Sequence, residues 1–197
     1  MTREVIILYS LFIDTHDKNV LIILFKDGKI LIKNEVFSLN KHSEVAMPAI
    51  DSVMKEANVD VSVLNDIIVV NGPGSFTGQR IAVTIGKTMA YCLNIPIRVI
   101  DALTIMAISI DSSEKIVALE DRNGAFVGKF DVNNNIIDSL QYINKSSYID
   151  FKEANNVIVD LDIDYEKVYN YVSKLNSLNP HEVKPLYIKG ISALNDK

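Results

Sequence analysis

The sequence predicts an α/β protein with two lobes, the second smaller than the first. Segments of strand length that are rich in Ile, Leu and Val alternate with longer segments whose apolar residues recur at helical spacing. One series of strands and helices ends near residues 101–104, and a shorter series of similar elements follows it. Because no linker rich in Pro, Gly or Ser separates the two series, we expect tightly joined lobes at residues 1–102 and 103–197.

Three strands and a helix are expected at the start of the chain. The dipeptide Asp27-Gly28 separates the second and third strands and indicates an antiparallel hairpin. The helix contains Pro48, so either it kinks there or its regular part begins near this residue. The predicted elements are strands 5–13, 20–25 and 30–37 and helix 42–57.

The centre of the chain reads as a buried strand, a glycine-rich turn and a long helix. The run Ile67-Ile68-Val69-Val70 is typical of a strand that is covered on both faces. Ser75 can cap the helix that follows the turn. The turn does not match the Walker, dinucleotide-binding or nucleophile-elbow patterns, which favours a structural turn over a nucleotide site. Its residues are Gly72, Pro73, Gly74, Ser75, Phe76, Thr77 and Gly78.

The long helix is apolar around most of its circumference. Lys87 is the only charged residue from residue 81 to residue 95. Such a helix is usually buried on two sides, and the second side can be covered by the chain's own fold or by another chain. The small residues Gly86 and Ala90 would let a neighbouring backbone approach closely, and we expect an interface here.

The remainder of the chain is predicted to form a second α/β unit. The dipeptide Asn123-Gly124 indicates another hairpin, and the partly apolar tail at residues 185–190 should pack against the rest of the protein. The predicted elements are strands 97–100, 115–119, 125–130, 136–143 and 157–159 and helices 102–110 and 165–175.

Composition narrows the possible functions. The formal net charge of −5 argues against direct binding of nucleic acid by this chain alone. Its single cysteine, Cys92, and three scattered histidines make no metal-binding pattern, and we expect no metal and no cofactor. The apolar run at residues 5–13 is too short to span a bilayer, so we expect a cytoplasmic protein without a membrane partner.

Asp14-Thr15, at the end of the first predicted strand, fits either a ligand-binding site or an ordinary turn stabilised by the Asp and Thr side chains.

Several motifs together resemble the bacterial TsaB (YeaZ) family, which is the dimerization subunit of the machinery that makes N6-threonylcarbamoyladenosine in tRNA. The most specific is the glycine-rich run from Gly72 to Gly78, followed by Arg80. The other matches, in the family's order, are Asp14-Thr15, His42-Ser43-Glu44 with Pro48, Asp121-Arg122 and the closing segment 185–189. Gln79 departs from the family, in which Leu is usual at this position.

This resemblance implies the fold shared by actin, Hsp70 and sugar kinases, with two lobes built on ribonuclease-H-like sheets. It also implies a non-catalytic role, in which the protein pairs with the catalytic subunit TsaD, in an assembly that includes the ATPase TsaE. The family forms homodimers in isolation, and its first two helices make the interfaces. Contact with tRNA would then come only through the complex.

The resemblance places the expected interface on these two helices. We expect Met47, Asp51, Val83, Thr84, Lys87 and Tyr91 to face the partner. The full set of predicted interface residues is His42, Glu44, Met47, Asp51, Arg80, Val83, Thr84, Lys87 and Tyr91. The alternatives are an active enzyme of the same fold, either a nucleotide-binding kinase or a metallopeptidase, and direct binding of tRNA.

Overall fold

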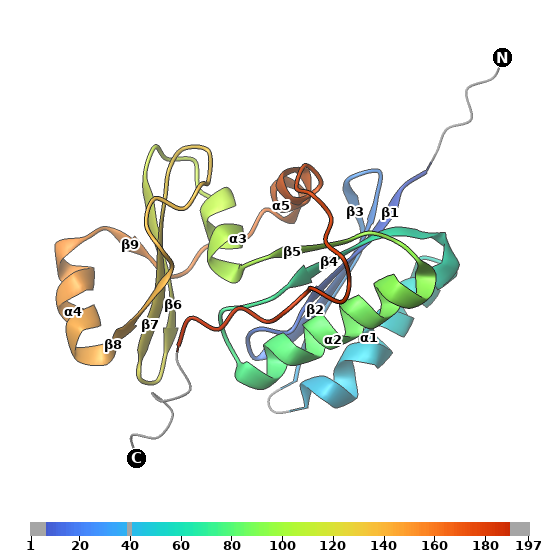
Figure 1. The fold of residues 1–197 in the computed structure, drawn as a ribbon, viewed down its shortest axis with the longest axis horizontal. Helices are drawn as coiled ribbons and strands as arrows, with labels where there is room; N and C mark the ends of the chain where they lie inside the picture. The colour runs from blue at the N-terminus through green and yellow to red at the C-terminus, as the bar shows by residue number, and fades with distance from the viewer. Residues whose placement is uncertain (1–6, 39–40, 190–197) are drawn as a thin grey trace.

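The protein consists of two β-sheets with helices on both faces of the larger one (Figure 1). The computed structural model describes residues 7–38 and 41–189. The larger sheet has the strand order β3-β2-β1-β4-β5, in which β1 pairs with β2 antiparallel and with β4 parallel. Its strands are β1 (Tyr9–Asp14), β2 (Asn19–Lys26), β3 (Lys29–Phe37), β4 (Leu64–Val70) and β5 (Ile97–Ile100).

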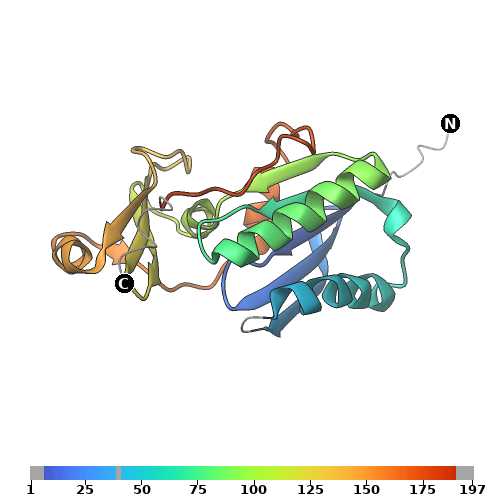
Figure 2. The same ribbon diagram turned by 60° about the horizontal axis from the view of Figure 1, so that its bottom comes forward.

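Alternating side chains give the larger sheet two buried faces. Leu11 and Ile13 of β1 pack on one face with helices α1 and α2, whereas Phe12 packs on the other with α3 and α5. Figure 2 shows α1 and α2 lying together over their face. The elements are α1 (His42–Glu56), the 3₁₀ turn η1 (Val61–Val63), α2 (Phe76–Leu93), α3 (Ala102–Ile108) and α5 (Tyr165–Val172).

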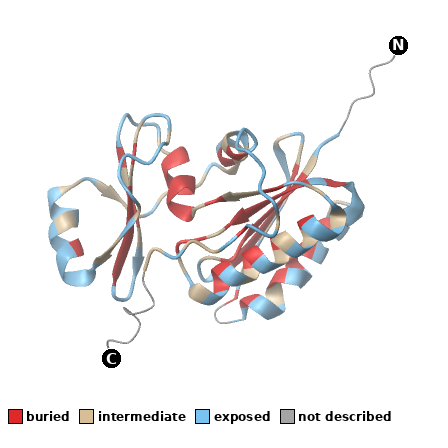
Figure 3. Cartoon of the chain, in the orientation of Figure 1, coloured by how far each residue is buried: buried red, intermediate tan, exposed pale blue. Residues whose placement is uncertain are grey.

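The smaller sheet forms the second lobe, in the order β8-β7-β6-β9. Helix α4 covers one face of this sheet through Tyr148, and α3 covers the other through Leu103 and Met106. All seven residues of α3 are buried, because it packs on both sheets and joins the two lobes (Figure 3). The elements are β6 (Lys115–Asp121), β7 (Gly124–Phe130), β8 (Gln141–Asn144), α4 (Lys145–Ala154) and β9 (Val157–Ile158).

The second lobe differs from the sequence prediction at two points. The predicted strand at 136–143 is reduced to β8, because Asp131 organises a loop by accepting bonds from the backbone amides of Asn133 and Asn135. Helix α4 was not predicted, since its short, polar sequence has only Tyr148 buried.

In the first lobe, the hairpin at Asp27-Gly28 is confirmed, and both residues have positive φ angles. Pro48 lies inside α1, which excludes the second of the two alternatives, that the regular helix begins near this residue. The carbonyl that Pro48 cannot bond belongs to Glu44, an exposed residue. The predicted first strand began at Val5, and its first two residues lie outside the described ones.

Gly86 explains how closely α2 lies on the larger sheet. A Cβ atom at this position would collide with the Val69 side chain of β4. Both Gly86 and Ala90 are buried against the chain's own sheet. The neighbour that these small residues admit is therefore the chain's own β4, and the expectation that they serve an interface is corrected.

The end of the chain returns to the first lobe. Val168 and Val172 of α5 are buried in the same apolar cluster as Phe12 of β1. Residues 179–189, which we call the C-terminal strap, then run beside α2 toward the smaller sheet (Figure 1). The division of the chain at residues 102 and 103 remains a prediction.

We predict that Gly86→Leu lowers the free energy of unfolding by about 1–3 kcal/mol, because the added atoms overpack the contact with Val69. Urea denaturation of the isolated chain measures this loss. Measured at a dilution at which the chain is monomeric, Thr88→Leu is the matched control, since it places the same side chain at an exposed position of α2 and should change stability little. Equal losses in both variants would contradict this packing.

Candidate protein-interaction surface

The glycine-rich turn fixes the start of α2 against β1. The Thr15 hydroxyl is fully buried, donates a hydrogen bond to the carbonyl of Gly78 at 2.6 Å and accepts one from the amide of Ala82 at 3.2 Å. A Cβ atom at Gly78 would collide with the Thr15 carbonyl, so only glycine permits this approach. The Ser75 side chain accepts a bond from the Gly78 amide and caps the helix. Thr15 therefore has a structural role.

Helix α2 is covered on three flanks and open on the fourth. Its inner flank packs on the larger sheet, and Ile85 and Met89 pack into the apolar cluster that α1 shares. The C-terminal strap lies along a third flank. The open flank carries the exposed threonines Thr77, Thr84 and Thr88. We call this flank the outer face of α2.

The strap is attached to both lobes. The Leu186 amide donates a hydrogen bond to the carbonyl of Asn71 at 2.7 Å, just beyond β4. The Lys189 ammonium lies 3.4 Å from the Asp121 carboxylate, at the tip of the hairpin between β6 and β7. Residues near the end of the chain therefore connect the larger sheet to the smaller one.

The strap also contacts the side chains along one flank of α2. The Tyr187 ring stacks on Phe76, with ring centroids 4.5 Å apart and planes 8° apart. The Arg80 Nε donates a hydrogen bond to the Tyr187 hydroxyl at 2.8 Å. The Lys87 ammonium donates to the carbonyl of Val183 at 3.4 Å. The predicted packing of the tail now has a location, which is the flank that includes Arg80 and Lys87.

The predicted interface residues differ in how far their side chains are exposed. Met47 and Tyr91 are 49% and 63% exposed. Val83 is 4% exposed and belongs to the core of the first lobe, so a partner would not reach it. His42 is also buried. The exposed members of the set are Glu44, Met47, Asp51, Arg80, Thr84 and Tyr91, and Lys87 is partly buried.

His42 is held within its own lobe. Its Nε2 atom lies 2.6 Å from the carbonyl oxygen of Asp17, which can only accept, so Nε2 carries a proton and donates it. This bond ties the start of α1 to the loop between β1 and β2. His42 therefore positions α1 and offers little to a partner.

A cavity of about 380 Å³ lies between the lobes, next to the end of β1. Its lining includes His16, whose Nδ1 lies 2.6 Å from the Asp14 carboxylate. Burial opposes charge on His16, but the attraction and hydrogen bond from Asp14 outweigh it and raise the pKa of the imidazole. These polar groups at the strand end are thus paired with each other.

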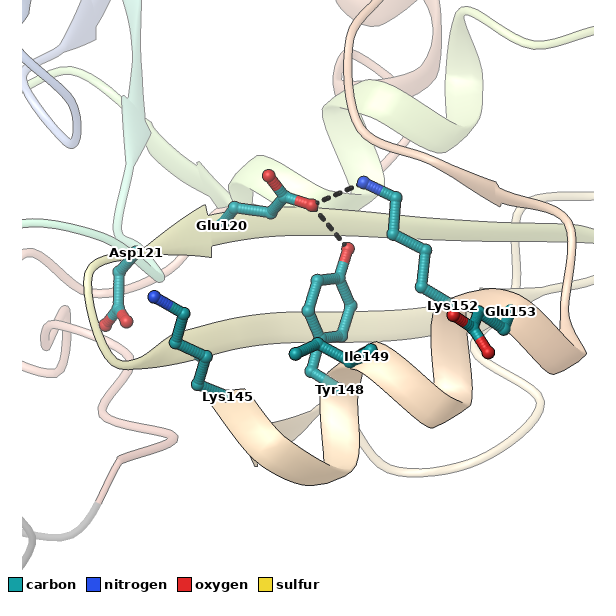
Figure 4. Close-up of a pocket in the computed structure, with 8 residues that line it drawn as sticks. Glu120, Asp121, Lys145, Tyr148, Ile149, Lys152 and Glu153 are labelled. Atoms are coloured by element: carbon teal, nitrogen blue, oxygen red, sulfur yellow. Dashed lines mark hydrogen bonds and ion pairs between the residues drawn. The ribbon is translucent and has the colours of Figure 1, made fainter.

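A second cavity, of about 500 Å³, lies between α4 and the hairpin of β6 and β7 (Figure 4). One oxygen of Glu120 accepts hydrogen bonds from the Tyr148 hydroxyl at 2.9 Å and from the Lys152 ammonium at 2.7 Å. Figure 4 shows Lys145 at the opposite end of the cavity. The cavity is lined by the ion pair of Lys152 with Glu120 and by the apolar side chain of Ile149. Among the side chains labelled in Figure 4, no nucleophile contacts a base.

The described part of the chain offers neither a cluster of metal ligands nor a membrane-spanning helix. Among residues 7–38 and 41–189, no three His, Cys, Asp or Glu side chains converge as a metal ion would require. Within the same residues, no helix is long and apolar enough to cross a membrane.

The fold and this surface define a class of protein, which is a two-lobed α/β scaffold with one exposed flank on its second helix, α2. A model of the family described as "TsaD: tRNA N6-adenosine threonylcarbamoyltransferase" matches residues 35–136. The structure titled "YeaZ from Pseudomonas aeruginosa" has a TM-score of 0.75 at 17% identity, over 91% of this chain and 99% of that one. This likeness and the two β-sheets confirm the predicted two-lobed α/β fold.

Two relatives place the chain more closely. The TsaB protein of Bacillus subtilis is 36% identical over 97 residues, which cover 49% of this chain and 42% of the relative. The TsaB protein of Buchnera aphidicola subsp. Baizongia pistaciae is 26% identical over 147 residues, which cover 74% of this chain and 62% of the relative. The chain thus matches less than two thirds of either relative's length. It belongs to the TsaB (YeaZ) family, as its glycine-rich run predicts.

Sequence reasoning missed the course of the strap. Periodicity predicts that an apolar tail packs but not where, because the contact of Tyr187 with Phe76 joins residues more than a hundred positions apart. The hydrogen bond from the Leu186 amide to the Asn71 carbonyl, just beyond β4, likewise joins distant residues. It is therefore seen only in the structure.

We predict that Thr15→Val lowers the free energy of unfolding by about 1–3 kcal/mol, because the Ala82 amide and the Gly78 carbonyl would lose a buried partner. Valine has nearly the shape of threonine, so the loss reports the hydrogen bonds. Thermal or urea unfolding measures it. At a dilution at which the chain is monomeric, Thr84→Val, at an exposed position, is the control, and a Thr15→Val variant as stable as that control would contradict the role of this hydroxyl.

We predict that the pair of His16 and Asp14 makes stability depend on pH. Because the pKa of His16 is raised in the folded state, its contribution is complete below its unfolded pKa of about 6.5 and is lost as pH rises through the folded value. Wild type should therefore exceed His16→Gln in unfolding free energy by more at about pH 5.5 than at about pH 8.5. Asp14→Asn should abolish this dependence, and a gap that widens with rising pH would contradict the pairing.

Proposed function

We propose that this chain is a non-catalytic subunit that is needed to form N6-threonylcarbamoyladenosine on the tRNA adenosine next to the anticodon. It acts by pairing with the catalytic subunit TsaD, in an assembly that includes TsaE, and contacts tRNA only through that assembly. In isolation it forms a homodimer through the same helices. The assembly works in the cytoplasm. The observation that carries this proposal is the open outer face of α2.

The outer face has the properties of a protein interface. Its exposed residues Thr77, Thr84 and Thr88 are uncharged, in a helix whose only charged residues are Arg80 and Lys87. Met47 of the neighbouring α1 is 49% exposed and extends the surface with an apolar side chain. Depletion of charge and exposure of Met are typical of the central part of an interface.

The non-catalytic role is supported by what the polar residues at the strand ends already do. In open α/β sheets, ligands bind at the carboxyl ends of the strands. Here Thr15 bonds the backbone of α2, His16 pairs with Asp14, and His42 donates to the Asp17 carbonyl. Each of these groups is used to hold the fold together.

We predict that Thr84→Glu abolishes co-purification with the cognate TsaD, because a carboxylate would be buried without a partner at the centre of the interface. Pull-down and size-exclusion chromatography measure the loss, and circular dichroism checks that the variant remains folded. Val83→Glu is unsuitable for this test, since Val83 is buried in the core and the variant would unfold.

Ser139→Glu supplies the control, as it places the same carboxylate at an exposed position of the second lobe. It should bind TsaD as wild type does. The proposal is wrong if folded Thr84→Glu still binds TsaD like the control, or if the wild-type chain does not bind TsaD at all.

A further inference from the structure

The strap and the flank of α2 that it covers share an unusual charge. Helix α2 contains Arg80 and Lys87 and no acidic residue. The strap contains Lys184, Lys189 and a single acid, Glu182. Together these segments have a net charge of +3, or +2 when Lys189 is counted with the Asp121 carboxylate that it faces, in a chain whose formal net charge is −5. The rest of the protein is therefore strongly acidic, and this strip stands out from it.

The cations of the strip are interleaved with aromatic rings. Arg80 lies over the stacked rings of Phe76 and Tyr187, 5.1 and 5.7 Å from their centroids. Tyr187 is 42% exposed. At the other end, the Tyr91 and His181 rings make a T-shaped contact with centroids 5.1 Å apart, and Tyr91 is 63% exposed. From Phe76 to Tyr91 the strip follows about four turns of α2, a length of roughly 22 Å.

The strip is ordered before any partner arrives. The Leu186 amide bonds the Asn71 carbonyl, and the Asn71 side chain donates to the carbonyl of Lys184 at 3.3 Å. Val183, between the two ends, is 2% exposed and part of the core. Lys184 itself is exposed, although its backbone carbonyl is held in this way. A preformed surface loses little entropy on binding.

We propose that the strap and α2 form one composite docking strip that binds an acidic protein surface on the catalytic subunit. This inference rests on the proposed function and deepens it, because it adds the strap to the interface and names the chemistry of the partner. Tyr and Arg are enriched among the residues that contribute most of the binding energy at protein interfaces. A strip with four cations, in a chain whose formal net charge is −5, favours a protein partner over RNA, because phosphate binding draws on larger clusters of Lys and Arg.

Charge reversal at Lys184 tests the composite strip. At low ionic strength, Lys184→Glu should weaken binding to the cognate TsaD about five- to tenfold, because one attraction becomes a repulsion. The effect should shrink at high salt, where exposed charges are screened. Lys184→Arg should bind as wild type does. Lys174→Glu, an exposed lysine just after α5 on the opposite side of the larger sheet, is the matched control and should also bind normally.

Calorimetry with full-length chains distinguishes the outcomes. If Lys184→Glu binds TsaD like wild type while Thr84→Glu does not, the strap is no part of the interface, and the composite strip is wrong while the proposed function stands. If Lys184→Glu binds TsaD normally but weakens the grip of the assembled complex on tRNA, the strip binds RNA and the inference is overturned. If wild type fails to bind TsaD, the proposed function falls and the inference falls with it.

Discussion

The structure depends on the contact between the Thr15 hydroxyl and the first turn of α2. One buried oxygen satisfies the Gly78 carbonyl and the Ala82 amide, so the end of β1 and the start of α2 are fixed in one geometry. Gly78 makes this approach possible at the start of the helix, and Gly86 makes it possible two turns later. With both glycines in place, an 18-residue helix lies flat along the larger sheet.

A helix held this closely has only its remaining flanks available for other contacts. Helix α1 takes one and the strap takes another, which leaves the threonine-bearing outer face open. The strap adds a second consequence, since it also reaches the Asp121 carboxylate of the smaller sheet. Any partner that touches the strap therefore contacts a segment that both lobes hold. The strap thus contributes both to the surface beside α2 and to the connection between the two lobes.

Much of this could be predicted from the sequence, for identifiable reasons. The buried run at residues 67–70, the glycine-rich turn and the apolar helix are local signals, and they predicted the centre of the fold correctly. The family could be predicted because seven consecutive residues of that turn are specific to it. Helix α4 could not, because it has one buried residue, and the course of the strap could not, because aromatic contacts between distant residues leave no local pattern.

The two faces of α2 also show where sequence reasoning stops. Periodicity identified an apolar helix but could not tell which small residues meet the chain's own sheet. Gly86 and Val83 proved to face inward, whereas Thr84 and Thr88 face outward. Neighbouring positions of α2 can therefore have opposite roles. A charged substitution is expected to unfold the protein at Val83 and to block binding at Thr84, and only the structure distinguishes the two positions.

The most direct test of the outer face is the reactivity of a cysteine placed on it. Cys92 is the only native cysteine, so Thr84→Cys in a Cys92→Ser background gives a single thiol at the centre of the face. At dilutions where the free chain is monomeric, a maleimide should modify this thiol rapidly, and saturating TsaD should slow the reaction by at least about tenfold. An unchanged rate in a complex shown to have formed would contradict the account.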